Sequence, residues 1–212
     1  LDVQMTKDGE LVVCHDEKID RTSDGKGWLK DFTLAELREF DFSYGDEAFK
    51  GAKIPTLREV FELFADTDMT INIELKTGIM FYSGIEEKTI ALTEEYGFMN
   101  RVIFSSFNHL SVKKIKELRP DAKCGFLYAD GTIGMPDYAK LHGMEALHPA
   151  LYNLQYEGFM KECKEKNIEV NVWTVDEEEY VKFCCMLGVD SIITNCPDKV
   201  FAVIEGMAGS KN

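Results

Sequence analysis

The sequence lacks an excess of positive charge. Its formal net charge at pH 7 is −14 over 212 residues, whereas binding to nucleic acid or to an anionic membrane surface calls for a basic patch. We therefore expect no nucleic-acid partner. An anionic substrate would need local positive charge, from a metal ion or from Lys and Arg side chains inside the site.

Other signals are missing as well. No apolar run approaches the ~20 residues of a transmembrane helix, and no internal repeat or interdomain linker is visible. The six cysteines form neither a C-x-x-C pair nor a zinc spacing, and most lie in apolar runs, as free thiols of a reducing compartment do. No signal peptide is visible, so we expect a cytoplasmic protein, although the chain starts without an initiator Met and a signal before Leu1 stays open.

What is present from residue 70 onward is an alternation of short β-rich runs with helical periods. This pattern predicts parallel strands joined by right-handed crossovers. We expect strands at residues 70–75, 101–105, 124–128, 146–148, 169–174 and 191–194. We expect helices at residues 84–96, 109–118, 136–141, 155–166, 177–187 and about 199–206.

The first 64 residues follow another pattern. Residues 1–5 and 11–14 flank an Asp-Gly pair, which favours a β-hairpin. Short helices are predicted at residues 33–40 and 56–64, because Thr33 with Glu36 and Thr56 with Glu59 fit capping boxes. The same reasoning makes Asp176, with Glu three residues later, a cap for the helix at 177–187.

The strand count has a consequence for the fold. Without the hairpin partner, seven parallel strands are predicted, whereas a closed (β/α)8 barrel needs eight. We expect a single α/β domain over residues 1–212, a TIM-type barrel that lacks its first βα unit. Residues 1–5 and 191–194 would then flank a gap and expose unpaired backbone groups, and a homo-oligomer is one way to cover such an edge.

Four side chains at or near predicted strand ends carry candidate chemistry: Asp2, His15, Glu74 and Lys76. Carboxylates suit Mg²⁺ or Ca²⁺, and an imidazole exchanges protons near neutral pH. Each also has a plainer interpretation. Asp2 could be a frayed terminal residue, His15 a core residue beside Cys14, Glu74 an ordinary strand-end carboxylate, and Lys76 a solvated lysine.

Several motifs together resemble the glycerophosphodiester phosphodiesterase family, relatives of the phosphatidylinositol-specific phospholipases C. They occur in family order along the whole chain, which makes the match specific. The matching stretches begin at Leu1 (LDVQMTKDG), Val12 (VVCHDE), Asp20 (DRTS), Ile54 (IPTL), Ile73 (IELK), Val172 (VWTV) and Gly188 (GVDSIITNCPD).

The resemblance implies a mechanism. The family holds a divalent metal, here Mg²⁺ or Ca²⁺, with acids that map onto Asp2 and Glu74, and it uses two histidines as acid and base, of which one maps onto His15. The other histidine, in a His-Arg-Gly motif, and a first acid would precede Leu1. We therefore expect this chain by itself to be inactive.

The resemblance also suggests substrate contacts. Lys76 is a candidate phosphate clamp, Arg21 would bind phosphate or brace its loop, His148 would line the site, and Trp173 would pack on the glycerol moiety or fill the core. Residues 16–53, a loop with a short helix, fit the small insertion that the family carries after the second barrel strand. Phe42, Tyr44 and Phe49 would shape the pocket there or form the insertion's own core.

The implied function is metal-dependent hydrolysis of glycerophosphodiesters to glycerol 3-phosphate and an alcohol, a reaction of lipid and glycerol metabolism. One alternative is a lysophospholipase D or sphingomyelinase D-like enzyme with a lipid substrate. A second is a non-catalytic homologue that binds a phosphodiester.

Overall fold

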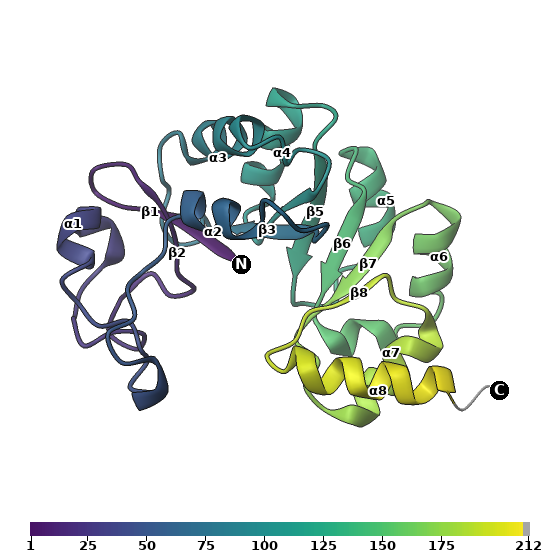
Figure 1. The fold of residues 1–212 in the computed structure, drawn as a ribbon. Coiled ribbons are helices and arrows are strands. Elements are labelled where there is room, and N and C mark those ends of the chain that lie inside the picture. Colours follow the sequence, from purple (N-terminus) through teal and green to yellow (C-terminus); the bar gives the residue numbers. More distant parts are fainter. Residues whose placement is uncertain (210–212) are drawn as a thin grey trace. The chain divides into compact units, whose positions relative to one another are not determined.

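The computed structural model describes residues 1–209 (Figure 1). The chain has an α/β fold and divides into two compact units, with the boundary between Lys123 and Cys124. The expectation of one barrel domain over residues 1–212 stays a prediction.

Unit 1 is built on four strands in the order β2-β1-β3-β4. They are β1 (Asp2–Met5), β2 (Leu11–Val13), β3 (Ile71–Leu75) and β4 (Val102–Ser106). β1 and β2 form the predicted antiparallel hairpin, with Val3 opposite Val13 and Gly9 in the turn at φ 86°. β1 pairs in parallel with β3, and β3 with β4, as the alternation of strands and helices predicts.

The prediction that residues 1–5 form an open sheet edge is wrong. β2 occupies one side of β1 and β3 occupies the other. The hairpin partner therefore satisfies the backbone groups that the strand count left unpaired. The absence of a first βα unit, which motivated that expectation, stays a prediction.

Unit 1 has six helical segments, two of which begin where capping boxes predict. They are η1 (Leu29–Asp31), α1 (Leu34–Leu37), η2 (Glu47–Phe49), α2 (Leu57–Phe64), α3 (Ile85–Glu95) and α4 (His109–Leu118). The Thr33 and Thr56 hydroxyls accept from the N–H groups of Glu36 and Glu59, whose carboxylates accept from the threonine N–H groups. Both capping boxes are thus confirmed.

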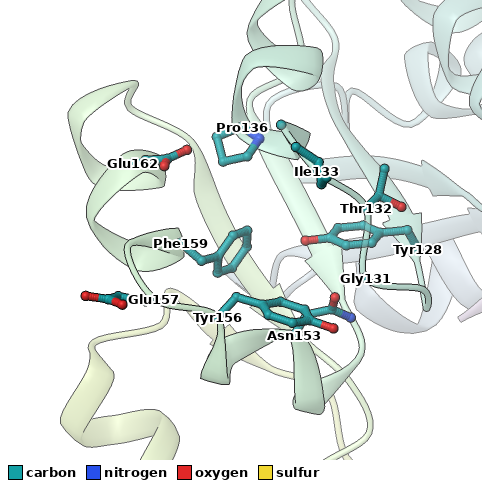
Figure 2. A pocket seen from close by; sticks show the side chains of 11 residues that line it. Tyr128, Gly131, Thr132, Ile133, Pro136, Asn153, Tyr156, Glu157, Phe159 and Glu162 are labelled. Carbon is teal, nitrogen blue, oxygen red and sulfur yellow. The ribbon is translucent and has the colours of Figure 1, made fainter.

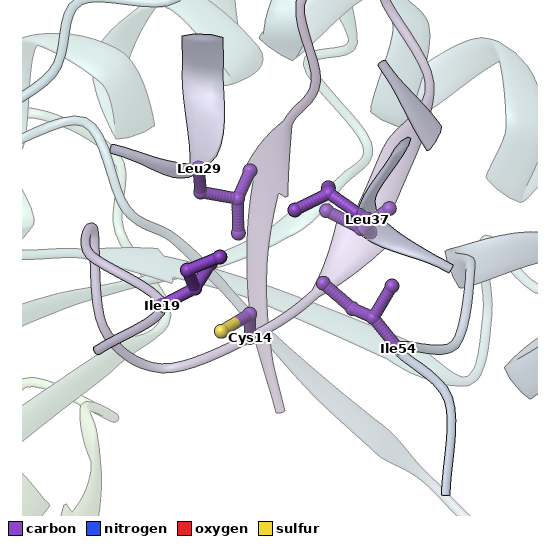
Figure 3. Packing of buried hydrophobic residues seen from close by; sticks show 6 residues of the cluster. Cys14, Ile19, Leu29, Leu37 and Ile54 are labelled. Atoms are coloured by element: carbon purple, nitrogen blue, oxygen red, sulfur yellow. The ribbon is translucent and has the colours of Figure 1, made fainter. Parts of the chain in front are cut away.

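Residues 16–53 contribute to a small hydrophobic core of unit 1. Figure 3 shows six buried side chains packed together: Val12, Cys14, Ile19, Leu29, Leu37 and Ile54. Phe42 packs against this cluster, whereas Tyr44 and Phe49 are exposed. The segment is therefore stabilised by apolar contacts that it shares with Val12, Cys14 and Ile54. Its identity as the family's insertion stays a prediction.

Unit 2 is built on parallel strands in the order β5-β6-β7-β8. They are β5 (Lys123–Tyr128), β6 (Ala146–Pro149), β7 (Glu169–Val172) and β8 (Ser191–Ile192). The helical segments are α5 (Met135–Leu141), η3 (Leu151–Gln155), α6 (Phe159–Glu165), α7 (Glu178–Leu187) and α8 (Pro197–Gly209).

Two helix starts in unit 2 differ from prediction. The helix expected from residue 155 begins only at Phe159, because Gly158 before it adopts φ 82° and ends the preceding turn. Asp176 does not cap α7: its carboxylate accepts hydrogen bonds from the Thr194 hydroxyl and from the backbone and side chain of Asn195. α7 ends at Leu187, as predicted, and Gly188 follows it in the left-handed conformation.

Within residues 1–209, no helix combines the length and the apolar character that crossing a bilayer requires. The six cysteines carry free thiols, and four of them are buried. This agrees with the interpretation of most cysteines as core residues.

Candidate functional site

Asp2 and Glu74 lie directly opposite each other on the parallel strands β1 and β3. On β3, Ile71, Ile73 and Leu75 are buried, so Glu74 points to the other face of the sheet. Burial raises the pKa of the Glu74 carboxyl; Lys76 lowers it, and the neighbouring Asp2 carboxylate raises it again. Two acids therefore share one small region at the carboxyl end of β3.

Lys76 follows β3 and lies beside Glu74. Its Nζ is 3.2 Å from Glu74 Oε1, and the two side chains are only 13% and 16% exposed. The sheet also fixes the backbone here, because the Lys76 N–H donates to the Val3 carbonyl at 3.0 Å. Lys76 is therefore no freely solvated lysine, and the plain interpretation of its side chain is wrong.

His15 follows directly after the residue that the hairpin places opposite Asp2. The Cys14 N–H donates to the Asp2 carbonyl at 3.0 Å, which continues the β1–β2 pairing by one residue. The His15 side chain is 63% exposed, with Nδ1 2.7 Å from Asp16 Oδ1. The alternative that His15 is a core residue is therefore wrong; the buried neighbour is Cys14.

Asp16 joins His15 to Arg21. Arg21 donates from Nε and Nη2 to the two Asp16 oxygens, both at 2.6 Å, and from Nη1 to the Tyr44 hydroxyl at 3.0 Å. The Arg21 hydrogen bonds, with a smaller effect of His15, lower the pKa of Asp16 from 3.8 to about 2. Asp16 is therefore ionised at neutral pH and accepts a hydrogen bond from His15 Nδ1, which leaves Nε2 for proton exchange. Arg21 does brace its loop, and its contact with phosphate stays a prediction.

Gln4 is a residue of this region that the sequence analysis missed. It is fully buried on β1, two residues after Asp2 and therefore on the same face. Its Nε2 donates to the carbonyls of Cys14 at 2.8 Å and Asp16 at 2.7 Å, while its Oε1 accepts from the Tyr82 hydroxyl at 2.9 Å. Gln4 thus holds both sides of His15. A glutamine at a buried strand position was the signal available in the sequence.

The side chains of this region supply some of the oxygen ligands that a hard divalent cation requires. Asp2 and Glu74 offer adjacent carboxylates, and a cation would offset the repulsion that raises the pKa of Glu74. Among residues 1–209, no three His, Cys, Asp or Glu side chains are grouped to hold a metal ion. Two protein carboxylates completed by water and substrate oxygens are an arrangement typical of Mg²⁺.

His148 and Trp173, the other predicted substrate contacts, belong to unit 2. His148 is buried, with Nε2 3.0 Å from Asn171 Nδ2, and its carbonyl accepts from Trp173 Nε1 at 2.8 Å. These contacts tie β6 to β7 and give both side chains a structural role. Their contact with substrate stays a prediction.

The chain matches the family model described as the glycerophosphoryl diester phosphodiesterase family over residues 1–199. It is 45% identical to a glycerophosphodiester phosphodiesterase of Caldanaerobacter subterraneus subsp. tengcongensis, over 97% of this chain and 84% of that protein.

Solved structures are similar too. One is a glycerophosphodiester phosphodiesterase from Parabacteroides distasonis, with a TM-score of 0.83, 26% identity and coverage of 98% of this chain and 83% of that one. Another is an Oleispira antarctica phosphodiesterase in complex with the product sn-glycerol-3-phosphate, with a TM-score of 0.81, 26% identity and coverage of 96% and 83%.

Proposed function

Because the chain belongs to the glycerophosphoryl diester phosphodiesterase family, we propose that it hydrolyses glycerophosphodiesters to glycerol 3-phosphate and a free alcohol. The observation that supports this most is in unit 1: Asp2 lies opposite Glu74, and Lys76 pairs with Glu74. The hairpin that begins at Asp2 leads directly into the His15–Asp16 pair. These groups supply negative charge for a cation, positive charge for an anion and a proton carrier. The proposed activity is that of a phosphoric diester hydrolase.

We propose that Asp2 and Glu74 hold a divalent cation, Mg²⁺ or Ca²⁺. When bound, the ion would polarise the phosphoryl oxygens of the substrate. Lys76, which is mostly buried, adds a fixed positive charge in the same place. Arg21 would add a second positive charge, in the loop that follows His15.

His15 would move the proton. In hydrolysis, the oxygen of water bonds to phosphorus, the bond from phosphorus to the alcohol oxygen breaks, and the alcohol leaves with a proton. His15 Nε2 can take a proton from the water or give one to the leaving oxygen, because Nδ1 is engaged by Asp16 at 2.7 Å. Asp16 orients the imidazole.

The alcohol would be choline or ethanolamine. In the lipid-cleaving alternative, the substrate would carry an acyl chain on the side of the phosphate opposite this alcohol. Neither that alternative nor the non-catalytic one is favoured by the relatives, which carry phosphodiesterase names. A cytoplasmic location and a homo-oligomeric state stay predictions.

The test is to incubate the full-length protein with glycerophosphocholine and to measure glycerol 3-phosphate by its enzymatic oxidation. We expect product from wild type and a kcat lowered about a hundredfold or more in His15→Ala, the usual scale for general acid–base catalysis. His142→Ala is the matched control, since that imidazole packs on Tyr138 in unit 2. Absence of glycerol 3-phosphate, or a near wild-type kcat in His15→Ala, would contradict the proposal.

A further inference from the structure

Unit 2 contains a pocket whose chemistry differs from that of the candidate phosphodiesterase site. It has a volume of about 250 Å³ and lies between the carboxyl end of β5, the loop at residues 129–134, η3 and the start of α6 (Figure 2). Three aromatic side chains surround it: Tyr128, Tyr156 and Phe159. Pro136, Glu157 and Glu162 complete much of the wall.

The pocket is on the opposite face of β5 from His148. Phe126 packs on Tyr138 of α5, with ring centroids 5.0 Å apart, and Tyr128 lies two residues on and therefore faces the same way. A side chain at Gly125, by contrast, would collide with the His148 ring. Strand β5 thus separates the pocket from the face that carries His148 and Asn171.

The polar groups of the pocket suit a cation. No Lys, Arg or His lines it, and neither Glu157 nor Glu162 forms an ion pair within residues 1–209. Asn153 uses its Nδ2 to donate to the Ala129 carbonyl at 2.7 Å, so its remaining amide atom is an acceptor. Two carboxylates and this oxygen attract positive charge. Lys166 interacts electrostatically with Glu162, but its Nζ forms its ion pair with Asp137, at 3.1 Å.

The aromatic rings suit the same ligand. An ammonium group is attracted to the faces of aromatic rings, and its methyl or methylene groups gain from apolar contact. Phe159 and Tyr128 are almost fully buried, which keeps these two walls fixed, while Tyr156 is half-exposed and forms the open side. Gly131 makes room for this ring, because a side chain there would collide with the Tyr156 hydroxyl.

We propose that this pocket binds a small organic ammonium ion, of the kind represented by choline and ethanolamine. The site goes beyond the proposed hydrolysis, since none of its residues belongs to the Asp2, Glu74, Lys76 and His15 cluster. The three rings provide cation–π contacts, and Glu157 and Glu162 provide the opposite charge.

The test is a calorimetric titration of the full chain with choline and with 3,3-dimethyl-1-butanol, the neutral molecule of the same shape. Choline should bind at least about tenfold more tightly, because only the cation interacts with the rings and the carboxylates. A parallel titration with ethanolamine distinguishes the sources: tighter binding of choline assigns the site to quaternary ammonium ions, and tighter binding of ethanolamine to primary ones.

Substitutions inside and outside the pocket test whether choline binds there. Tyr156→Leu and Glu162→Gln should each weaken choline binding several-fold to about tenfold, whereas Tyr180→Leu and Glu165→Gln, which change exposed residues of unit 2 outside the pocket, should not. Gly131→Ala is a second route to the same result, because its methyl group displaces the Tyr156 ring without removing it.

Three results would overturn the proposal. One is equal affinity for choline and its neutral isostere, and another is no binding of choline or ethanolamine. The third is choline binding that survives Tyr156→Leu and Gly131→Ala but is lost in Glu74→Gln, which would place the ligand in the candidate phosphodiesterase site.

Discussion

Asp16 is the residue on which the geometry of His15 depends most. It accepts from His15 Nδ1 and from Arg21, and this pairing lowers its pKa to about 2 from the ordinary value of 3.8. A carboxyl group whose pKa is lowered on folding stabilises the folded protein above its ordinary pKa. That contribution is lost as the pH falls from about 4 toward 2.

Asp16→Asn should therefore destabilise the protein at pH 7 by about 1 kcal/mol, the upper range for an exposed ion pair. The difference from wild type should shrink as the pH falls below about 4, because the wild-type carboxyl then takes up a proton. Urea unfolding at a series of pH values measures both free energies of unfolding.

Asp68→Asn serves as the control, since Asp68 is exposed in the turn after α2. It should leave the free energy of unfolding unchanged at each pH. A difference between Asp16→Asn and wild type that is the same at pH 7 and pH 3 would show that the ion pairs of Asp16 do not carry its contribution.

At the scale of elements, the segment after β2 is positioned by β1 through one side chain. Gln4 donates to the carbonyls on both sides of His15 and accepts from Tyr82. All of these contacts are buried or partly buried, so water replaces them poorly.

Gln4→Leu should release this segment and lower kcat in the full-length enzyme about tenfold, with a smaller effect on KM, because His15 would lose its fixed position. Amide hydrogen exchange of residues 14–16 should become faster. Tyr82→Phe should produce a milder form of both changes, since it removes only the hydroxyl that supports Gln4.

Tyr96→Phe provides the comparison, because it removes a hydroxyl that bonds to Glu62 on the surface of unit 1. It should change neither exchange at residues 14–16 nor kcat. If Gln4→Leu unfolds the protein, Tyr82→Phe still decides, and unchanged exchange in Tyr82→Phe would contradict the positioning role.

The sequence predicts elements well where the interactions are local. The capping boxes of α1 and α2 depend on residues three apart, and both are present. Asp176 had the same local signal, yet its carboxylate binds Thr194 and Asn195, 18 and 19 residues away. A contact of that range competes with the cap and leaves no trace in the local pattern.

The residues of the candidate site also divide into those that sequence signals predict and those whose role depends on contacts distant in the sequence. Strand ends and motifs predict that Asp2 and Glu74 are neighbours, because parallel pairing brings them into register. Gln4 was missed because its role consists of hydrogen bonds to a loop ten and twelve residues away. The prediction of an open sheet edge at residues 1–5 was wrong because the strand count left out the hairpin partner.

At the scale of the whole molecule, the central question is how a strongly acidic protein binds an anionic substrate. The protein carries a net charge of −14 and is proposed to bind an anion. The Lys76 ammonium lies against Glu74, so only part of its charge is available to a phosphate. A divalent cation between Asp2 and Glu74 would reverse the local sign and make the site attractive to a phosphodiester.

The account is tested most directly by glycerol 3-phosphate release from glycerophosphocholine in the full-length enzyme before and after EDTA. Release should stop in EDTA and return with Mg²⁺ or Ca²⁺. Glu74→Gln should lower kcat about a hundredfold or more even with added metal, because a bound metal contributes several kcal/mol, while Glu62→Gln, at an exposed glutamate of α2, should behave as wild type. Full activity of wild type in the chelator would contradict the account.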